Sequence, residues 1–144
     1  MHFKKLNKKG DRMRILNLTQ HAPTKEQKEN GVFEPNAEDK EVIREYLTFN
    51  NIPSKRNIKM RAKALSDIAF KYNIEQGIQK VLIGGAPYLM SSLERSLIAK
   101  GLTPVYAFSK RVSKEITLPS GSVEKKMIFR HEGFIELNIR DITK

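Results

Sequence analysis

The sequence predicts a three-layer α/β domain with a mainly parallel sheet and a C-terminal β-hairpin or β tail. Three observations support this fold class. Short apolar runs alternate with segments whose apolar residues recur at helical spacing, as in βαβ units. Residues 81–83 are continuously apolar, which is typical of a strand covered on both faces. After residue 111 the apolar period changes to two, which indicates antiparallel strands.

The first predicted unit is a strand, a polar loop and the start of a helix. Ile15, Leu16 and Leu18 form a short buried strand that ends at Thr19. Thr24 is followed three residues later by a glutamine, and this capping box predicts that a helix begins near residue 25. The polar side chains of the first loop therefore lie between a strand and a helix.

Two further helices are predicted before the next strand. Asn36, with acidic residues in the first turn after it, caps a helix whose apolar face includes Val42 and Ile43. A break at residues 50–53 ends this helix, and Ser54 begins the next one. The outer face of that third helix is basic, through Lys55, Arg56, Lys59, Arg61 and Lys63.

Residues 80–111 have the length and pattern of a βαβ unit. In this interpretation Ser91 and Glu94 form a capping box at the start of the helix, and Gly101 ends it. The unit consists of a strand at 81–83, a glycine loop from 84, the helix and a third parallel strand at 105–108.

The C-terminal part of the chain is predicted to be all strand. Alternating apolar residues at 112–118 and 123–129, separated by a turn at 119–122, indicate a β-hairpin. A last strand at 134–137 follows a second turn at 130–133.

Composition sets the class of protein. The 144 residues have the length of about one domain. Charged residues make up 30% and hydrophobic residues 39%, which is ordinary for a folded globular protein. The absence of cysteine excludes disulfides and thiolate metal sites. Because no apolar run is long enough to cross a bilayer and no signal peptide is evident, we expect a cytoplasmic protein without a membrane partner.

The formal net charge of +11 favours anionic partners. The first fourteen residues hold six Lys or Arg against one Asp. Residues 1–12 lack periodicity, so we expect them to form a basic flexible arm, and residues 13–144 to form a single ligand-binding domain. Nucleic acid is accordingly a candidate partner of the basic residues 4–14.

Three loops are predicted to converge at one edge of the sheet. In open parallel sheets, ligands bind outside the carboxyl ends of the strands, at a point where the strand order reverses. The loops are Thr19-Gln20-His21, Gly84-Gly85-Ala86-Pro87 and Ser109-Lys110-Arg111. We expect them to bind a phosphate-bearing ligand.

Each loop suits an anion for a separate reason, and each has a structural alternative. Two glycines let backbone amides approach a ligand, and the helix that follows favours negative charge at its start; they also make a tight turn. Thr19 and Gln20 supply polar contacts or satisfy loop backbone groups. Lys110 and Arg111 neutralise phosphate, while Ser109 and Arg111 alternatively form a polar strand exit and a solvated charge.

Chemistry is predicted to centre on histidine. His21 is the best-placed general acid or base, because imidazole titrates near neutrality and a hydroxyl and an amide precede it. His131 is a second candidate, and a structural hydrogen-bonding role is the alternative for both. The histidines lack metal-ligand spacing, so no metal and no cofactor are expected.

Four segments, ILNLTQHAPTKEQ, VLIGGAP, VYAFSKR and FRHEGFIEL, carry a family resemblance. In content and order they resemble small stand-alone CRISPR-associated proteins with a Rossmann-like CARF fold, some of which act as ring nucleases on cyclic oligoadenylate. The resemblance covers most of residues 13–137.

This resemblance implies a homodimer that binds a cyclic nucleotide across its two-fold axis. It implies metal-free cleavage, in which a ribose 2′-hydroxyl attacks the adjacent phosphate, His21 protonates the leaving oxygen and Arg111 holds the phosphate. The implied ligand contacts are Thr19, Gln20, Gly84, Gly85 and Ala86, with Ser109 and Lys110 added by position.

Two alternatives stay open. One is a sensor or sponge that binds the nucleotide without turnover. The other is an RNA- or DNA-binding protein that uses residues 1–12 and the basic face of the third helix.

Overall fold

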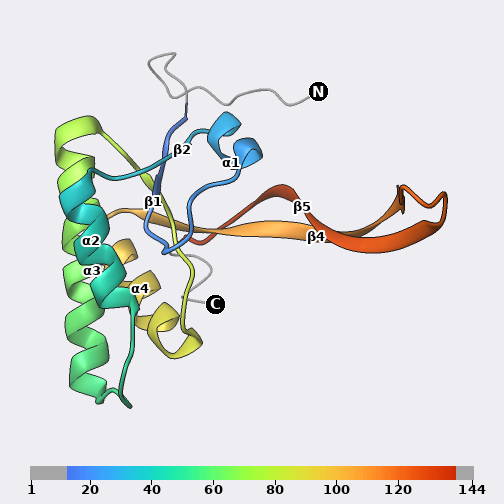
Figure 1. Ribbon diagram of the computed structural model, residues 1–144. Coiled ribbons are helices and arrows are strands. Elements are labelled where there is room, and N and C mark those ends of the chain that lie inside the picture. Colours follow the sequence, from blue (N-terminus) through green and yellow to red (C-terminus); the bar gives the residue numbers. More distant parts are fainter. Residues whose placement is uncertain (1–12, 139–144) are drawn as a thin grey trace.

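The computed structural model describes residues 13–138, so the arm predicted at residues 1–12 lies outside the described residues, as do residues 139–144. Figure 1 shows the elements in chain order. They are β1 (Ile15–Asn17), α1 (Lys25–Glu29), β2 (Val32–Phe33), α2 (Ala37–Leu47), α3 (Lys55–Gln76), β3 (Lys80–Leu82), α4 (Pro87–Ala99), β4 (Thr103–Thr117) and β5 (Val123–Glu136).

The strands form one sheet in the order β2-β1-β3-β4-β5. β1 pairs in parallel with β2 and β3, and β3 pairs in parallel with β4, whereas β5 runs antiparallel to β4. The prediction of an α/β fold with a mainly parallel sheet is confirmed. β2 was not predicted, because a strand of two residues is too short to show an alternation of apolar and polar residues.

The helices are divided unequally between the two faces of the sheet (Figure 1). α2, α3 and α4 cover one face and enclose the main core, in which Leu16, Leu65, Val81, Leu93 and Leu97 are fully buried. The other face buries a smaller cluster and carries only the five-residue α1, none of whose residues is buried. The predicted third layer is therefore reduced to one short helix.

Side-chain caps explain where three of the four helices of the described region begin. Thr24 forms the predicted capping box with Gln27, and Asn36 and Ser54 accept bonds from the amides three residues ahead. For α4 the prediction is wrong. This helix begins at Pro87 and passes through Ser91, because proline suits the first helical position, where its missing N–H is no loss.

The last two strands are longer than predicted. β4 and β5 are continuous over 15 and 14 residues, so the turn predicted at residues 130–133 and the loop predicted at 109–111 do not exist. One irregularity in the pairing, between Phe108 and Ser109, replaces both. A β-bulge accommodates one extra residue in a strand while the pairing continues on both sides of it. The alternation of apolar residues does not distinguish such a bulge from a turn. The predicted hairpin turn is confirmed, with the Leu118 amide donating to the Ser122 carbonyl at 2.8 Å.

In the described part of the chain, no helix combines the length and the apolar character that crossing a membrane requires.

Candidate functional site

The carboxyl ends of β1 and β3 lie side by side at one edge of the sheet. The Leu18 amide donates to the Leu82 carbonyl at 2.8 Å just after β1 ends. The chain passes from β1 outward to β2 and then returns across β1 to β3, so the strand order reverses between β1 and β3. This is the position at which open α/β sheets bind ligands. We call the loops that meet here the β1/β3 edge: residues 18–23 and 83–88.

Asn17 shapes the first loop of this edge. Its side-chain oxygen accepts from the Thr19 amide at 3.0 Å and from the Thr19 hydroxyl at 2.7 Å, and its Nδ2 donates to the His21 carbonyl at 2.8 Å. The same Nδ2 donates to Glu34, just after β2. The sequence analysis missed Asn17, although its signal is visible: it is the one polar residue in the apolar run 15–18.

The glycine loop contacts the first loop, as predicted. A Cβ built on Gly84 would lie 3.6 Å from Cγ2 of Thr19. Gly85 has φ +153, and a Cβ there would meet side chains of Leu47 and Met90 at 3.7 and 3.5 Å. The two glycines thus lie in the turn between β3 and α4, as one of the two interpretations of the sequence predicted.

The start of α4 lies at this edge and has no side-chain cap. Ala86 occupies the N-cap position and makes no side-chain hydrogen bond, and the first turn of the helix contains no acidic residue. Pro87 has no N–H and the Leu89 amide donates to the Ala86 carbonyl at 2.9 Å, so the Tyr88 amide and the helix dipole are what favour an anion here. Tyr88 follows at the second helical position with a 53% exposed side chain.

The third segment at this edge is the connection between α2 and α3. Nε2 of Gln20 donates to the Thr48 hydroxyl at 3.2 Å, and the Phe49 and Tyr88 rings meet edge to face with centroids 5.0 Å apart. This segment was not predicted at the site, because the periodicity of a helix does not indicate which end of the sheet the following connection will contact.

Ser109, Lys110 and Arg111 do not form the predicted third loop. They lie within β4 and pair with His131, Arg130 and Phe129 of β5. The Arg111 guanidinium lies 5.8 Å from the centroid of the Phe129 ring. All three residues are exposed on the strand pair that extends past the body of the protein, so their predicted convergence with the β1/β3 edge is wrong.

The two candidate histidines have different surroundings. His21 is exposed, and its described bonds involve only its backbone, so the imidazole is available to a ligand. His131 packs against Phe134 with ring centroids 4.8 Å apart, and neither ring nitrogen has a hydrogen-bond partner among the described residues. Burial lowers the pKa of His131 although the charges of Glu26 and Glu132 oppose this, which favours a neutral, structural imidazole.

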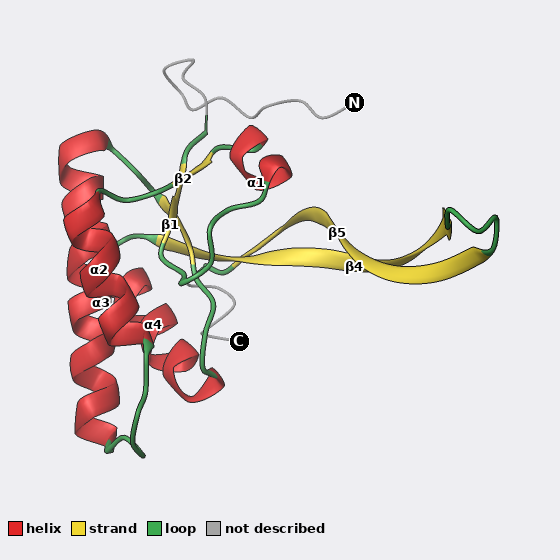
Figure 2. Ribbon diagram, viewed as in Figure 1, coloured by secondary structure: helices red, strands yellow, loops and turns green. Residues whose placement is uncertain are grey.

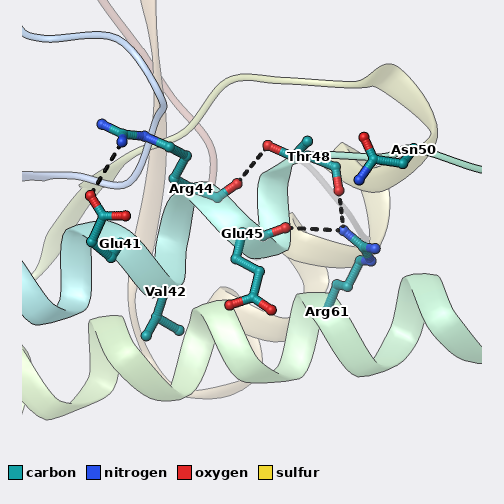
Figure 3. A pocket seen from close by; sticks show the side chains of 7 residues that line it. All are labelled: Glu41, Val42, Arg44, Glu45, Thr48, Asn50 and Arg61. Carbon is teal, nitrogen blue, oxygen red and sulfur yellow. Dashed lines mark hydrogen bonds and ion pairs between the residues drawn. The ribbon is translucent and has the colours of Figure 1, made fainter.

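A hollow is lined by residues of α2, by Thr48 and Asn50 of the connection that follows, and by Arg61 of α3 (Figure 3). It measures about 520 Å³ and centres on Arg61. Nη1 of Arg61 donates to the Thr48 and Tyr46 carbonyls at 2.7 and 3.0 Å, and the guanidinium lies 4.2 Å from the Phe49 ring centroid. Because Arg61 closes the carboxyl end of α2, it anchors Phe49 rather than offering a free cation.

Several acidic and basic residues of the body form ion pairs with one another. Lys63 pairs with Asp67 at 3.0 Å, so together with Arg61 it removes two of the five cations predicted for the face of α3. Among the residues that the structure describes, no group of three His, Asp or Glu side chains is arranged to hold a metal ion.

The fold and the edge together define an α/β protein with a candidate anion site where β1 meets β3. Residues 13–135 match the uncharacterized protein MJ1673 family, and the chain belongs to that family. The match includes the body and nearly all of the β4–β5 pair. Neither the curated proteins nor the solved structures include a match.

Proposed function

We propose that this protein is a Rossmann-like domain that binds a cyclic oligonucleotide at the β1/β3 edge. The observation that carries the proposal is the meeting of three features at the point of strand-order reversal: the glycine turn, the uncapped start of α4 and the polar loop shaped by Asn17. A phosphate accepts from the Tyr88 amide at the positive end of α4, and the flexible glycine backbone lets it approach closely.

Tyr88 and His21 extend this site toward a nucleoside. The Tyr88 ring is exposed yet supported from one side by Phe49, which makes it a stacking platform for a base. The free imidazole of His21 lies in the adjoining loop. A ligand with two-fold symmetry would join two copies of this edge, so the proposal includes a homodimer.

Cleavage of the ligand is the second candidate function, and the available imidazole favours it. A general acid at His21 would protonate the leaving oxygen after attack by the neighbouring 2′-hydroxyl, without a metal. Arg111 has no part in this proposal, because it contacts Phe129 on the extended strand pair. A sensor or sponge would use the same edge without turnover.

The test is a thermal-shift and product assay with cyclic di-, tri-, tetra- and hexanucleotides in the absence of metal. Ligand at 100 times its dissociation constant should stabilise the protein by about 2.7 kcal/mol. We expect Tyr88→Ala to weaken binding about tenfold or more, since base stacking contributes about 1–3 kcal/mol. Phe129→Ala is the matched control, an exposed aromatic outside the edge, and should bind normally.

His21→Ala separates the two candidate functions. For a ring nuclease this variant retains binding and loses linear product, whereas for a sensor the wild-type protein yields no product at all. If no cyclic nucleotide shifts the melting temperature, or if Phe129→Ala weakens binding as much as Tyr88→Ala, the β1/β3 edge is not the site.

A further inference from the structure

The strand pair formed by residues 107–134 extends away from the body of the protein (Figure 2). We call it the ribbon. None of its residues is fully buried, in contrast to Val105 just before it. A two-stranded ribbon is only marginally stable in water without a partner surface. Because the side chains of the ribbon are not buried in a core, packing does not explain which residues occupy it.

One face of the ribbon carries four cations arranged as two cross-strand pairs. Lys110 lies opposite Arg130, and Lys114 lies opposite Lys126. Residues directly opposite point to the same face, and alternate residues of a strand share a face, so both pairs point the same way. The apolar pair Val112 and Ile128 lies between the two cation pairs on the same face. We call these residues the basic face.

Within the described residues 13–138, none of these four cations forms an ion pair. Like charges directly opposite one another destabilise a strand pair. The basic face thus works against the stability of the free ribbon, and an anionic partner would reverse that effect.

The opposite face of the same ribbon is built differently. There Lys125 lies opposite Glu115, so the charges alternate in sign. Arg111 lies opposite Phe129 and stacks over its ring. The basic face also includes one carboxylate, Glu124 opposite Ile116, so it holds four cations against one Glu, whereas the whole ribbon holds six Lys or Arg and three Glu.

Charge decides between the two obvious occupants, a second copy and a polyanion. A second copy would carry the same net charge of +11. The segment of the body richest in acidic residues, α2, has four carboxylates, of which Asp39 and Glu41 already pair with Lys71 and Arg44, so two are left to meet the four cations of the basic face. A nucleic acid backbone, in contrast, supplies phosphates along its whole length.

The dimensions favour duplex DNA. The two cation pairs are four residues apart along β4, which corresponds to about 13 Å of strand. A two-stranded ribbon fits the major groove of B-DNA, which is about 12 Å wide, whereas the major groove of A-form RNA is too narrow. Cations on one face of an inserted ribbon reach phosphates flanking the groove.

The geometry points to a DNA-binding arm: the ribbon binds duplex DNA through the basic face, independently of the β1/β3 edge. Contact with phosphates makes this binding insensitive to sequence and strongly dependent on salt. DNA binding by the ribbon does not depend on ligand binding at the β1/β3 edge, and the reverse also holds.

The experiment is fluorescence anisotropy of the full chain with a random-sequence 20-base-pair DNA duplex, at salt concentrations from about 50 to 200 mM. We expect Lys114→Ala/Lys126→Ala to bind at least tenfold more weakly and to reduce the slope of log K against log salt by about 2. Lys110→Ala/Arg130→Ala should do the same, which guards against a fold defect in one variant.

The matched control is Arg111→Ala/Lys125→Ala, which removes two charges from the opposite face. It should change affinity less than threefold, and circular dichroism should show all variants folded. Three results would overturn the proposal: no duplex binding, equal losses in basic-face and control variants, or single-stranded DNA or duplex RNA bound as tightly as duplex DNA. A dimer in sedimentation that dissociates in Lys114→Ala/Lys126→Ala would instead identify a second copy as the occupant.

Discussion

The body and the ribbon of this protein are held together by different forces. In the body, helices α2, α3 and α4 bury Leu93, Leu97 and Val81 completely against the sheet. The ribbon continues two strands of that sheet but leaves Phe129 73% and Met127 53% exposed. Burial of side chains stabilises the body, whereas the ribbon depends mainly on backbone hydrogen bonds and leaves most of its side chains exposed to a partner.

The largest expected effect tests this contrast directly. Leu93→Ala removes a fully buried side chain from α4 and should lower the free energy of unfolding by about 2–5 kcal/mol. Ile128→Ala makes the corresponding change in the ribbon and should cost about 1 kcal/mol or less. Urea unfolding followed by helical circular dichroism measures both. Equal losses would mean that the ribbon packs as tightly as the body.

A close backbone approach in the body gives the next effect. Gly31 has φ +101, and a Cβ there would lie 2.1 Å from the backbone oxygen of Met13. We expect Gly31→Ala to cost about 2–3 kcal/mol, from strain and from the displaced strand. Gly77→Ala, with φ +70 and no atom within 4 Å, isolates the strain and should cost about 1 kcal/mol. Thermal unfolding measures the loss of stability of each variant. Similar losses for the two variants would show that the backbone at Met13 moves to accommodate the added Cβ.

The smallest expected effect is on the pH dependence of stability, and it compares Asp39, a paired carboxylate of the body, with Glu115, a carboxylate of the ribbon. Burial alone would raise the pKa of Asp39, but hydrogen bonds from Lys71 at 2.5 Å and Tyr72 at 2.8 Å, with the Lys71 charge, lower it below 3.8. A lowered folded pKa stabilises the protein above pH 3.8, and this stability is lost as pH falls through the lowered value.

Asp39→Asn should therefore reduce the loss of stability below pH 4 and be less stable than wild type at pH 7. Denaturation in urea at several pH values tests this. Glu115→Gln, which changes an exposed ribbon carboxylate that forms no ion pair with the described residues, should follow the wild-type curve. An unchanged acid response of Asp39→Asn would mean that other carboxylates control it.

The local predictions succeeded where a few neighbouring residues decide the outcome. Thr24, Asn36 and Ser54 begin helices as predicted, because a cap needs only an amide two or three residues ahead. Prediction failed at Val42, which is 37% exposed although it was assigned to the apolar face of its helix. Its neighbour Ile43 is the one buried, because the position of the sheet selects which side of α2 is inner.

The candidate site was predicted in two of its three parts. Thr19 and Gly84 do meet, since parallel strands place their carboxyl ends at one edge. The third part was assigned to residues 109–111, yet Thr48 and Phe49 occupy that place. A polar, basic sequence after a strand is the same whether the strand stops or continues as an exposed ribbon, so pattern alone does not distinguish the two.

The sequence by itself determined the α/β class, the helix starts at Thr24, Asn36 and Ser54, the glycine turn and the excess of positive charge. These depend on composition and on contacts within a few residues. Only the tertiary structure decided the strand order, the unequal division of the helices between the two sheet faces, the length of the ribbon and the alignment of Lys114 with Lys126. The physical reason is that cross-strand register and layer assignment follow from pairing and burial between residues distant in the chain.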